Sequence, residues 1–214
     1  MDKLIFKENA KLVKIREFIY PYYDKEIEKE LVEHGITELY SFGKTNLGKL
    51  KVVGKGKTGV IVLLDEKRVI KIRRSDSPKE SLEIEAKIQT LAFPVAPKVY
   101  DYGKNFIVMD YIEGDNLNNT RKNKNVIIDL LLKAKELENR KIEHKELARP
   151  YKNVIVSEND NVYIIDYDSA SIKENPYNVT SILSWLRLPN LAILYKKHKN
   201  IEEILNFVES LDWV

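Results

Sequence analysis

Three oxygen-bearing side chains, Glu146, Asn153 and Asp166, are the residues of this sequence whose types best suit chemistry. Carboxylate and amide oxygens are ligands for a hard cation such as Mg²⁺ and for the phosphates that this ion carries. The three residues can act together only if the chain folds back on itself between positions 153 and 166.

A β-hairpin is predicted in this segment. Two β-branched runs, 153–156 and 162–165, flank a turn-like segment at 158–161. Asn153 opens the first strand and Asp166 follows the second, so a tight hairpin brings both close together. Glu146 then arrives from the preceding loop. The alternative is a surface hairpin with acidic turns and no ligand.

A glycine-rich segment of the form G-x-G-x-x-G, with Gly54, Gly56 and Gly59, suits phosphate binding. A dinucleotide-binding loop of this form must lead into a helix. Here a strand is predicted at 50–53 before the loop, and apolar strands at 60–64 and 68–72 follow it. Backbone N–H groups of such a loop can approach a phosphate closely. The alternative is a glycine-rich hairpin without a ligand.

Lys71 interrupts the second of these apolar strands. The two-residue period places it on the same face as Val69, where a covered lysine needs an anionic partner. A helix is predicted at 78–92, with a capping box that begins at Ser77. On that helix Glu85 lies at the edge of the apolar face and can meet Lys71. The alternative for Glu85 is an ordinary surface pair.

The remaining pattern predicts an α+β protein with helices at both ends. Two N-terminal helices, 9–19 and 24–34, form an extension without evident chemistry, and two short strands precede an exit from the sheet at 110–114. An amphipathic helix follows at 124–140. The other expected elements are strands at 98–102 and 106–109, helices at 178–187, 190–197 and 201–211, and two core tryptophans, Trp185 and Trp213.

Composition excludes several classes of protein. The 214 residues include 36 basic and 33 acidic side chains, a balance that does not favour nucleic acid or an anionic membrane as a partner. Cysteine is absent, so disulfide and thiol chemistry are excluded. No apolar run reaches the length of a membrane span and no signal-peptide core is present, so we expect a cytoplasmic protein.

Taken in order, these motifs resemble the protein-kinase-like superfamily over residues 48–187. Positions 69–71 match V-A-I-K, residues 109–114 match the adenine-binding hinge, and residues 144–147 stand where H-R-D-L is expected. Residues 166–168 stand where D-F-G is expected. The short tail after Asp166 is similar to compact kinases of the RIO and KEOPS-complex type and to small predicted archaeal Ser/Thr kinases.

The resemblance implies a bilobal α+β fold, with a small antiparallel-sheet lobe that contains one helix and a reduced, mainly helical second lobe. The expected domains are an extension at 1–45 and lobes at 46–109 and 110–214. ATP and Mg²⁺ are the implied cofactors. The implied nucleotide-binding residues are Gly54, Gly56, Gly59, Ile61, Val69, Lys71, Glu85, Met109, Asp110, Ile112 and Ile155; the implied metal ligands are Asn153 and Asp166; and the implied catalytic residues are Glu146, Asp166 and Lys71.

Three departures from the family pattern concern catalysis. Glu146 replaces the usual catalytic Asp, the spacing from Glu146 to Asn153 is longer than in H-R-D-x-x-x-x-N, and Asp168 replaces the Gly of D-F-G. Glutamate can still act as a base, but a misplacement of about 1 Å can cost on the order of 100-fold in rate.

Two activities fit these residues and the resemblance. The first is ATP- and Mg²⁺-dependent phosphoryl transfer to a Ser or Thr hydroxyl, including one on the chain itself. The sequence does not distinguish a protein acceptor from a small-molecule one. The second is a nucleotide-binding regulatory or scaffold module, either a pseudokinase or a slow ATPase switch. An RNA-associated factor that uses the basic tracts 121–124 and 196–199 is less favoured, because the tracts are short and have few aromatic neighbours in the sequence.

Overall fold

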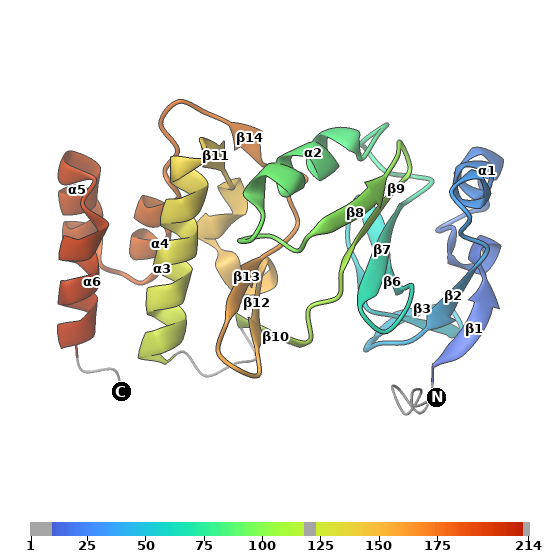
Figure 1. The fold of residues 1–214 in the computed structure, drawn as a ribbon, viewed down its shortest axis with the longest axis horizontal. Coiled ribbons are helices and arrows are strands. Elements are labelled where there is room, and N and C mark those ends of the chain that lie inside the picture. Colours follow the sequence, from blue (N-terminus) through green and yellow to red (C-terminus); the bar gives the residue numbers. More distant parts are fainter. Residues whose placement is uncertain (1–9, 118–122, 212–214) are drawn as a thin grey trace. The chain divides into compact units, whose positions relative to one another are not determined.

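The computed structural model describes residues 10–117 and 123–211, which divide into two compact units. The first unit contains residues up to 87 and the segment 98–111. The second unit contains the segment 88–97 and the residues from 112 onward. Both units mix helices with antiparallel strands, as Figure 1 shows, and the predicted α+β class is confirmed.

An antiparallel sheet forms the centre of the first unit. Its strands β6 (Gly59–Leu63) and β7 (Arg68–Arg73) carry Gly59 and Lys71 and pair from Gly59↔Arg73 to Leu63↔Val69. Within the described residues the sheet order is β1 (Lys11–Lys14), β2 (Glu38–Ser41), β6 (Gly59–Leu63), β7 (Arg68–Arg73), β9 (Phe106–Asp110) and β8 (Val99–Tyr102), with β5 (Gly54–Lys55) paired to β6. A separate hairpin joins β3 (Thr45–Leu47) to β4 (Leu50–Val52).

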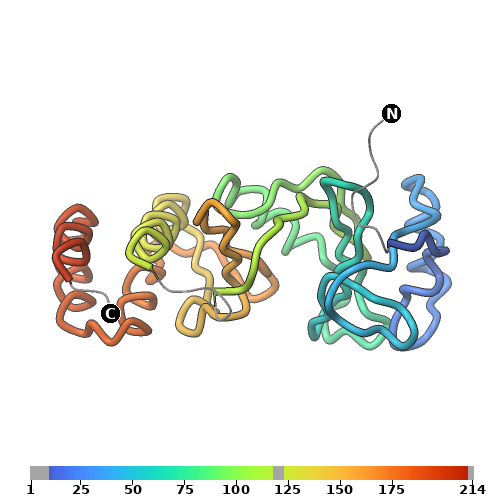
Figure 2. The backbone as a smooth tube through the Cα atoms, turned by 90° about the horizontal axis from the view of Figure 1, so that it is seen from below, coloured from blue at the N-terminus to red at the C-terminus, as the bar shows by residue number. Residues whose placement is uncertain are grey.

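One face of this sheet packs against the N-terminal segment. Helix α1 (Lys25–Glu33) buries Ile27 and Leu31 against sheet residues that include Ile70 and Phe106. Asp24 caps the helix by accepting hydrogen bonds from two backbone N–H groups of the first turn, as predicted. Figure 2 shows this segment (blue) lying along the strands of the same unit.

The prediction of a helix at 9–19 is wrong. The chain forms the edge strand β1 and then the short 3₁₀ helix η1 (Ile15–Phe18). Leu12, assigned to an apolar helical face, is 48% exposed. Pairing of β1 with β2, from Lys11↔Ser41 to Lys14↔Glu38, supplies backbone hydrogen bonds that a short helix cannot match.

The predicted helix at 78–92 begins later, as α2 (Glu83–Ala92). Ser81 Oγ accepts from the N–H of Glu83, while backbone groups of the residues before it bond to other segments of the first unit. The predicted apolar face is also partly wrong, because Ile84 is 72% exposed and Leu91 is exposed. Leu82 and Ala86 are buried instead, so the helix is rotated toward the side that carries Glu85.

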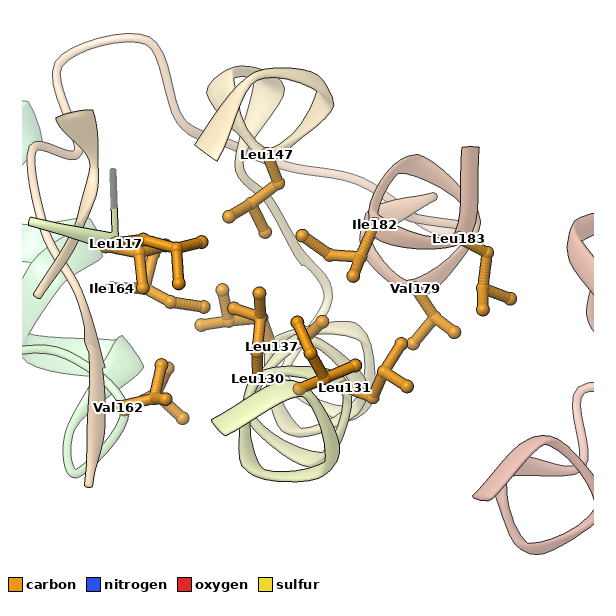
Figure 3. Packing of buried hydrophobic residues seen from close by; sticks show 14 of the residues in the cluster. Leu117, Leu130, Leu131, Leu137, Leu147, Val162, Ile164, Val179, Ile182 and Leu183 are labelled. Atoms are coloured by element: carbon orange, nitrogen blue, oxygen red, sulfur yellow. The ribbon is translucent and has the colours of Figure 1, made fainter. Parts of the chain in front are cut away.

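The second unit packs around helix α3 (Lys124–Asn139), as predicted. The residues expected on its inner face are all buried: Ile127, Leu130, Leu131, Ala134 and Leu137. The predicted hairpin is present as β12 (Val154–Ser157) and β13 (Val162–Ile164), with β10 (Gly114–Asn116) on its outer edge. Figure 3 shows side chains of the hairpin and of α3 converging in one apolar cluster.

The rest of the second unit connects these elements. Short pieces precede and follow the hairpin: β11 (Ile142–Glu143), η3 (Lys145–Ala148), η4 (Pro150–Lys152) and β14 (Ser171–Ile172), with β11 paired to β14. The three expected C-terminal helices are α4 (Asn178–Trp185), α5 (Pro189–His198) and α6 (Ile201–Ser210). Trp185 is partly buried against the core, whereas Trp213 lies outside the described residues.

None of the described helices combines the length and the apolar character that crossing a membrane requires.

Candidate functional site

The glycine-rich segment forms a hairpin in the first unit. Gly54 pairs with Ile61 across β5 and β6, and the N–H of Gly56 donates to the carbonyl oxygen of Gly59 at 2.9 Å. Gly56 and the lysine on each side of it are exposed, while Thr58 and Gly59 are buried. The loop therefore has an exposed Lys-Gly-Lys tip next to a buried base formed by Thr58 and Gly59.

Arg74, which the sequence did not indicate, holds this tip. Its N–H donates to the carbonyl oxygen of Thr58, and its Nη1 donates to that of Gly56 at 3.1 Å. Its guanidinium also lies over the ring of Tyr20, 5.1 Å from the ring centre. The Lys55 ammonium lies over the same ring, 5.0 Å from its centre. A basic residue just after a strand gives no sequence signal for such a role, because its contacts come from distant segments.

Lys71 and Glu85 form the predicted contact. Lys71 Nζ lies 2.6 Å from Glu85 Oε1, and each side chain is only 6% exposed. Lys71 sits between Ile61 and Ile107 in the sheet, and Glu85 comes from the first turn of α2. A buried ion pair is costly to desolvate, so this one is evidence of specific placement more than of stability.

Gly59 is shaped to the Lys71 side chain. A Cβ at position 59 would lie 2.9 Å from Lys71 Cγ, 3.0 Å from Lys71 Cε and 3.0 Å from the carbonyl oxygen of Ile72. Gly59 therefore lets the lysine stem pass directly beneath the loop. Gly56 is different, because the nearest atom to a Cβ there is the Gly59 carbonyl oxygen at 3.9 Å.

The apolar residues assigned to adenine are divided between the units. Val69 pairs with Met109 across β7 and β9, and Ile61 is two strands from Met109 in the same sheet. Ile112 and Ile155 belong to the second unit. Ile61, Met109, Ile112 and Ile155 are all half-buried, so each keeps some accessible surface.

Asp110 is already engaged by neighbouring groups. Its carboxylate accepts from the Tyr100 hydroxyl at 2.7 Å and from the N–H of Lys98 at 3.2 Å. Its own N–H donates to the carbonyl oxygen of Lys98 at 2.9 Å. These contacts pin the end of β9 to β8.

The hairpin of the second unit brings Asn153 and Asp166 together. The N–H of Ile165 donates to the carbonyl oxygen of Asn153 at 2.9 Å, which closes the open end of the hairpin. Asp166 follows with φ of 63° and an exposed side chain. Asp tolerates this left-handed conformation better than most residues, and such positions concentrate at functional sites.

Glu146 reaches the same place from η3. Leu147 is buried in the core, where Figure 3 shows it pointing toward α3, and Glu146 itself is exposed. Glu146 Oε2 accepts from Asn153 Nδ2 at 2.9 Å. This bond orients the amide, so Asn153 presents Oδ1 as its remaining acceptor. The predicted proximity of these two residues is therefore present.

The buried side chain of His144 contacts the end of the hairpin at Ile165. Its buried Nε2 donates to the carbonyl oxygen of Ile165 at 3.0 Å, and its ring meets that of Tyr167 edge to face at 5.0 Å. Burial lowers the pKa of His144, while Ile165, Asp166 and Glu146 oppose that shift. Burial also raises the pKa of Tyr167. Both rings are therefore neutral at physiological pH.

Asn178 was read in the sequence only as the start of a helix. Its buried side chain accepts from the N–H of His144 at 2.9 Å and donates to the carbonyl oxygen of Ile142 at 2.7 Å. It thereby fixes the segment that leads to Glu146. The only sequence signal was an Asn at a helix terminus, which normally indicates a cap.

The basic tract at 196–199 ends α5 and has aromatic neighbours that the sequence did not reveal. Lys196 and Lys199 lie over the Tyr177 ring at 5.7 and 5.3 Å. Of the other tract, 121–124, the first two residues lie outside the described part of the chain.

A resident metal site is not evident in the described part of the chain, where no three His, Cys, Asp or Glu side chains cluster suitably. Asn153 and Asp166 are a smaller donor set, one amide and one carboxylate. Mg²⁺ that arrives with a nucleotide needs only one or two carboxylates, because phosphates and water complete its shell. The residues present therefore fit a nucleotide-borne Mg²⁺.

Comparisons with known proteins show the fold. No protein-family model and no curated protein matches the sequence. Among solved structures, WbdD with the kinase inhibitor LY294002 is similar at a TM-score of 0.54 and 17% identity, over 95% of this chain and 61% of that one. The aminoglycoside phosphotransferase APH(2'')-Ib with ADP is similar at 0.51 and 15%, over 88% and 93%.

The chain thus has a protein-kinase-like fold. It spans 61% of the length of the WbdD chain. At these identities the similarity shows the fold alone.

Proposed function

We propose that this protein transfers the γ-phosphoryl group of ATP, with Mg²⁺, to a hydroxyl group. The observation that carries the proposal is the buried Lys71–Glu85 pair directly beneath Gly59 of the glycine-rich loop. A buried lysine that is held in one position, next to a backbone segment without side-chain bulk, is suited to binding a polyanion. Burial of such an ion pair is weak evidence for a role in folding stability.

In the first unit, Lys71 binds the α- and β-phosphates and Glu85 holds its ammonium in position. The loop that contains Gly54, Gly56 and Gly59 covers the phosphates. Ile61, Val69 and Met109 offer the apolar contact for adenine. Because the transition state gains mainly from positioning and charge neutralisation, these roles supply most of what the reaction needs from this unit.

In the second unit, Asn153 Oδ1 and the Asp166 carboxylate hold Mg²⁺, which neutralises charge on the phosphates when bound. Ile155, two residues after Asn153, and Ile112 add apolar contact for the base. The exposure of Asp166 supports this assignment, because a carboxylate that binds an incoming ion must remain accessible.

Glu146 orients the acceptor hydroxyl and accepts its proton. The oxygen–phosphorus bond to the acceptor forms as the bond between phosphorus and the β,γ-bridging oxygen breaks, and ADP leaves. Glutamate is one methylene longer than the usual aspartate, and the hydrogen bond from Asn153 restricts this longer side chain. The restriction supports the assignment of Glu146 as the base.

The acceptor class is a Ser or Thr hydroxyl, in a protein partner or on this chain. A small-molecule alcohol is the competing class, because one structural neighbour is an aminoglycoside phosphotransferase.

A nucleotide-binding module without transfer is the second candidate. The observation in its favour is that the Glu146 carboxylate is tied to Asn153, the residue assigned to the metal. A base engaged in this way can deprotonate an acceptor only if the contact opens or a second lone pair is used.

The test uses ATP labelled on the γ-phosphate, with Mg²⁺, on wild type, Asp166→Asn and Glu146→Gln. Glu158→Gln is the matched control, because Glu158 is an exposed carboxylate in the turn of the same hairpin. Label on protein, label on a panel of small alcohols, and free phosphate are followed together.

Transfer by wild type and the control, lost in both other variants, supports a kinase with Glu146 as the base. Loss in Asp166→Asn alone keeps the metal site and removes Glu146 from the base role. Bound nucleotide without transfer by wild type favours the binding module. Absence of ATP binding overturns the proposal.

A further inference from the structure

The N-terminal helix α1 is tied to the turn between β8 and β9 through one side chain. Glu30 Oε1 accepts from the N–H of Lys104 at 2.7 Å, and Glu30 Oε2 accepts from the N–H and Nδ2 of Asn105 at 3.0 and 2.5 Å. These contacts join residues more than 70 positions apart in the chain. The 103–105 turn thus closes around a single carboxylate, and hydrogen bonds to a charged acceptor are stronger than neutral ones.

Gly103 is shaped to this contact. A Cβ at position 103 would lie 2.1 Å from Glu30 Oε1 and 2.9 Å from a ring carbon of Phe106. A side chain at this position cannot coexist with Glu30 in its present place. The missing Cβ at Gly103 therefore leaves the space that the Glu30 carboxylate occupies.

The same turn holds the strand that carries Lys71. The carbonyl oxygen of Asn105 accepts from the N–H of Arg73 at 2.8 Å, and Asn105 Oδ1 accepts from Arg73 Nε at 2.7 Å. Asn105 is buried, with its amide donating to Glu30 and accepting from Arg73. Arg73 is two residues after Lys71 on β7, so the turn fixes the end of that strand.

The turn also holds the helix that carries Glu85. The carbonyl oxygen of Lys104 accepts from the N–H of Leu82 at 2.9 Å, and Leu82 leads directly into α2. Leu82 is buried with Ala86 and Ile107, next to the first turn of the helix. The two partners of the ion pair, Lys71 and Glu85, are thus both attached to the turn that Glu30 closes.

We propose that Glu30 is a positioning residue for the Lys71–Glu85 pair. Its link from α1 through the 103–105 turn to the start of α2 is called the brace. The brace itself is independent of nucleotide, whereas its effect on ATP binding rests on the proposed function. Helix α1 is suited to the task because Ile27 and Leu31 anchor it in the core while Glu30, at the edge of that buried face, reaches the turn.

The test measures how readily acetylating reagent reaches Lys71, with sites located by mass spectrometry, in the whole protein without nucleotide. The variants are Glu30→Gln, which places amide hydrogens against the donors of the turn, and Gly103→Ala, which displaces an intact Glu30 and also presses on the ring of Phe106. Glu33→Gln is the matched control, because Glu33 is exposed on the same helix. Lys133 on α3, which is partly exposed, is the internal reference for the reactivity of the reagent in each sample.

We expect Lys71 labelling to rise roughly 5- to 10-fold in both variants, with Lys133 and the Glu33→Gln control unchanged, because local opening becomes more populated. ATP affinity should fall about 3- to 30-fold, the usual range for coupling through a packed network. Unchanged Lys71 labelling in both variants would overturn the brace. Raised labelling with unchanged ATP affinity would overturn its role in positioning the pair for nucleotide.

A separate arm distinguishes this result from failure of the proposed function. MgATP is added to wild type during labelling. Protection of Lys71 supports nucleotide binding at the pair. If MgATP does not protect Lys71 and does not bind, the proposed function fails, while raised labelling of Lys71 in the two variants still establishes the brace.

Discussion

The charged residues of the two units are held in different ways. In the first unit, Lys71 and Glu85 are buried and bonded to each other, and the strand and helix that carry them are fixed by the 103–105 turn. In the second unit, Glu146 and Asp166 are exposed, and buried neutral neighbours such as His144 fix the backbone beneath them.

This difference separates two physical problems. A charge whose partner belongs to the protein can be buried, because the partner offsets part of its desolvation. A charge whose partner arrives from solution must stay accessible, so its position is set by the backbone and not by packing around the charged group. Stability is therefore expected to depend strongly on the charged pair in the first unit and weakly on the carboxylates in the second.

The largest expected effect on stability is that of Glu85→Ala. The substitution removes the carboxylate that accepts from buried Lys71, and breaking a buried pair from one side costs about 3–5 kcal/mol. Urea unfolding monitored by circular dichroism measures the change. Glu83→Ala, an exposed position on the same helix, is the control and should cost less than about 1 kcal/mol. Equal effects of the two variants would contradict the contrast drawn between buried and exposed charges.

Gly59→Ala comes next and leaves both charges in place. The added methyl group meets the Lys71 stem and the carbonyl oxygen of Ile72 closer than ordinary van der Waals contact, and overpacking of this kind costs about 1–3 kcal/mol. Gly56→Ala, with open space around it, should change stability by less than about 0.5 kcal/mol. Thermal unfolding of the two variants checks the difference; a larger loss for Gly56→Ala would show that the loop is seated differently.

A smaller effect is expected from the buried histidine of the second unit. Burial lowers the pKa of His144, so below its ordinary value of about 6.5 the unfolded chain binds the proton more readily than the folded protein does. Stability therefore falls as the pH drops through that value. Melting temperatures at pH 7.5 and 5.5 should differ less for His144→Gln than for wild type.

An identical pH dependence of the melting temperature in wild type and His144→Gln would contradict this prediction. Asp166 and Glu146 lie close enough to raise the pKa of His144 and oppose the effect of burial, so Glu146→Gln should enlarge the acid sensitivity of wild type.

The smallest effect on stability is expected for Asp166→Asn and Glu146→Gln, each within about 0.5 kcal/mol of wild type. Both side chains are exposed, and Asn tolerates the positive φ of position 166 as well as Asp does. The same changes should reduce phosphoryl transfer by on the order of 100- to 1,000-fold. Unfolding and transfer assays on the same preparations measure both, and a large loss of stability would mean that these carboxylates are structural.

Elements with strong local signals followed from the sequence. Helix α3 has an uninterrupted apolar period, and the β12–β13 hairpin has β-branched runs around a polar turn. Alternation along β7 placed Lys71 on an inner face, and the helical period allowed Glu85 to reach it. In each case the residues that decide the structure lie within a few positions of one another.

Two elements that depend on distant partners were predicted incorrectly. The segment 11–14 has a helical pattern but becomes a strand because β2 offers it an edge. Helix α2 starts late because the backbone before it bonds to the 103–105 turn.

The sequence by itself determined which residue types are available for chemistry, and it predicted the local elements that carry Lys71, Asn153 and Asp166. The tertiary structure decided that Glu30 closes the 103–105 turn, that Gly103 leaves room for it, and that Arg74 holds the tip of the glycine-rich loop. The physical reason is that these contacts join segments far apart in the chain: their hydrogen bonds form only after the core has brought the segments together, and no local pattern of residues encodes them.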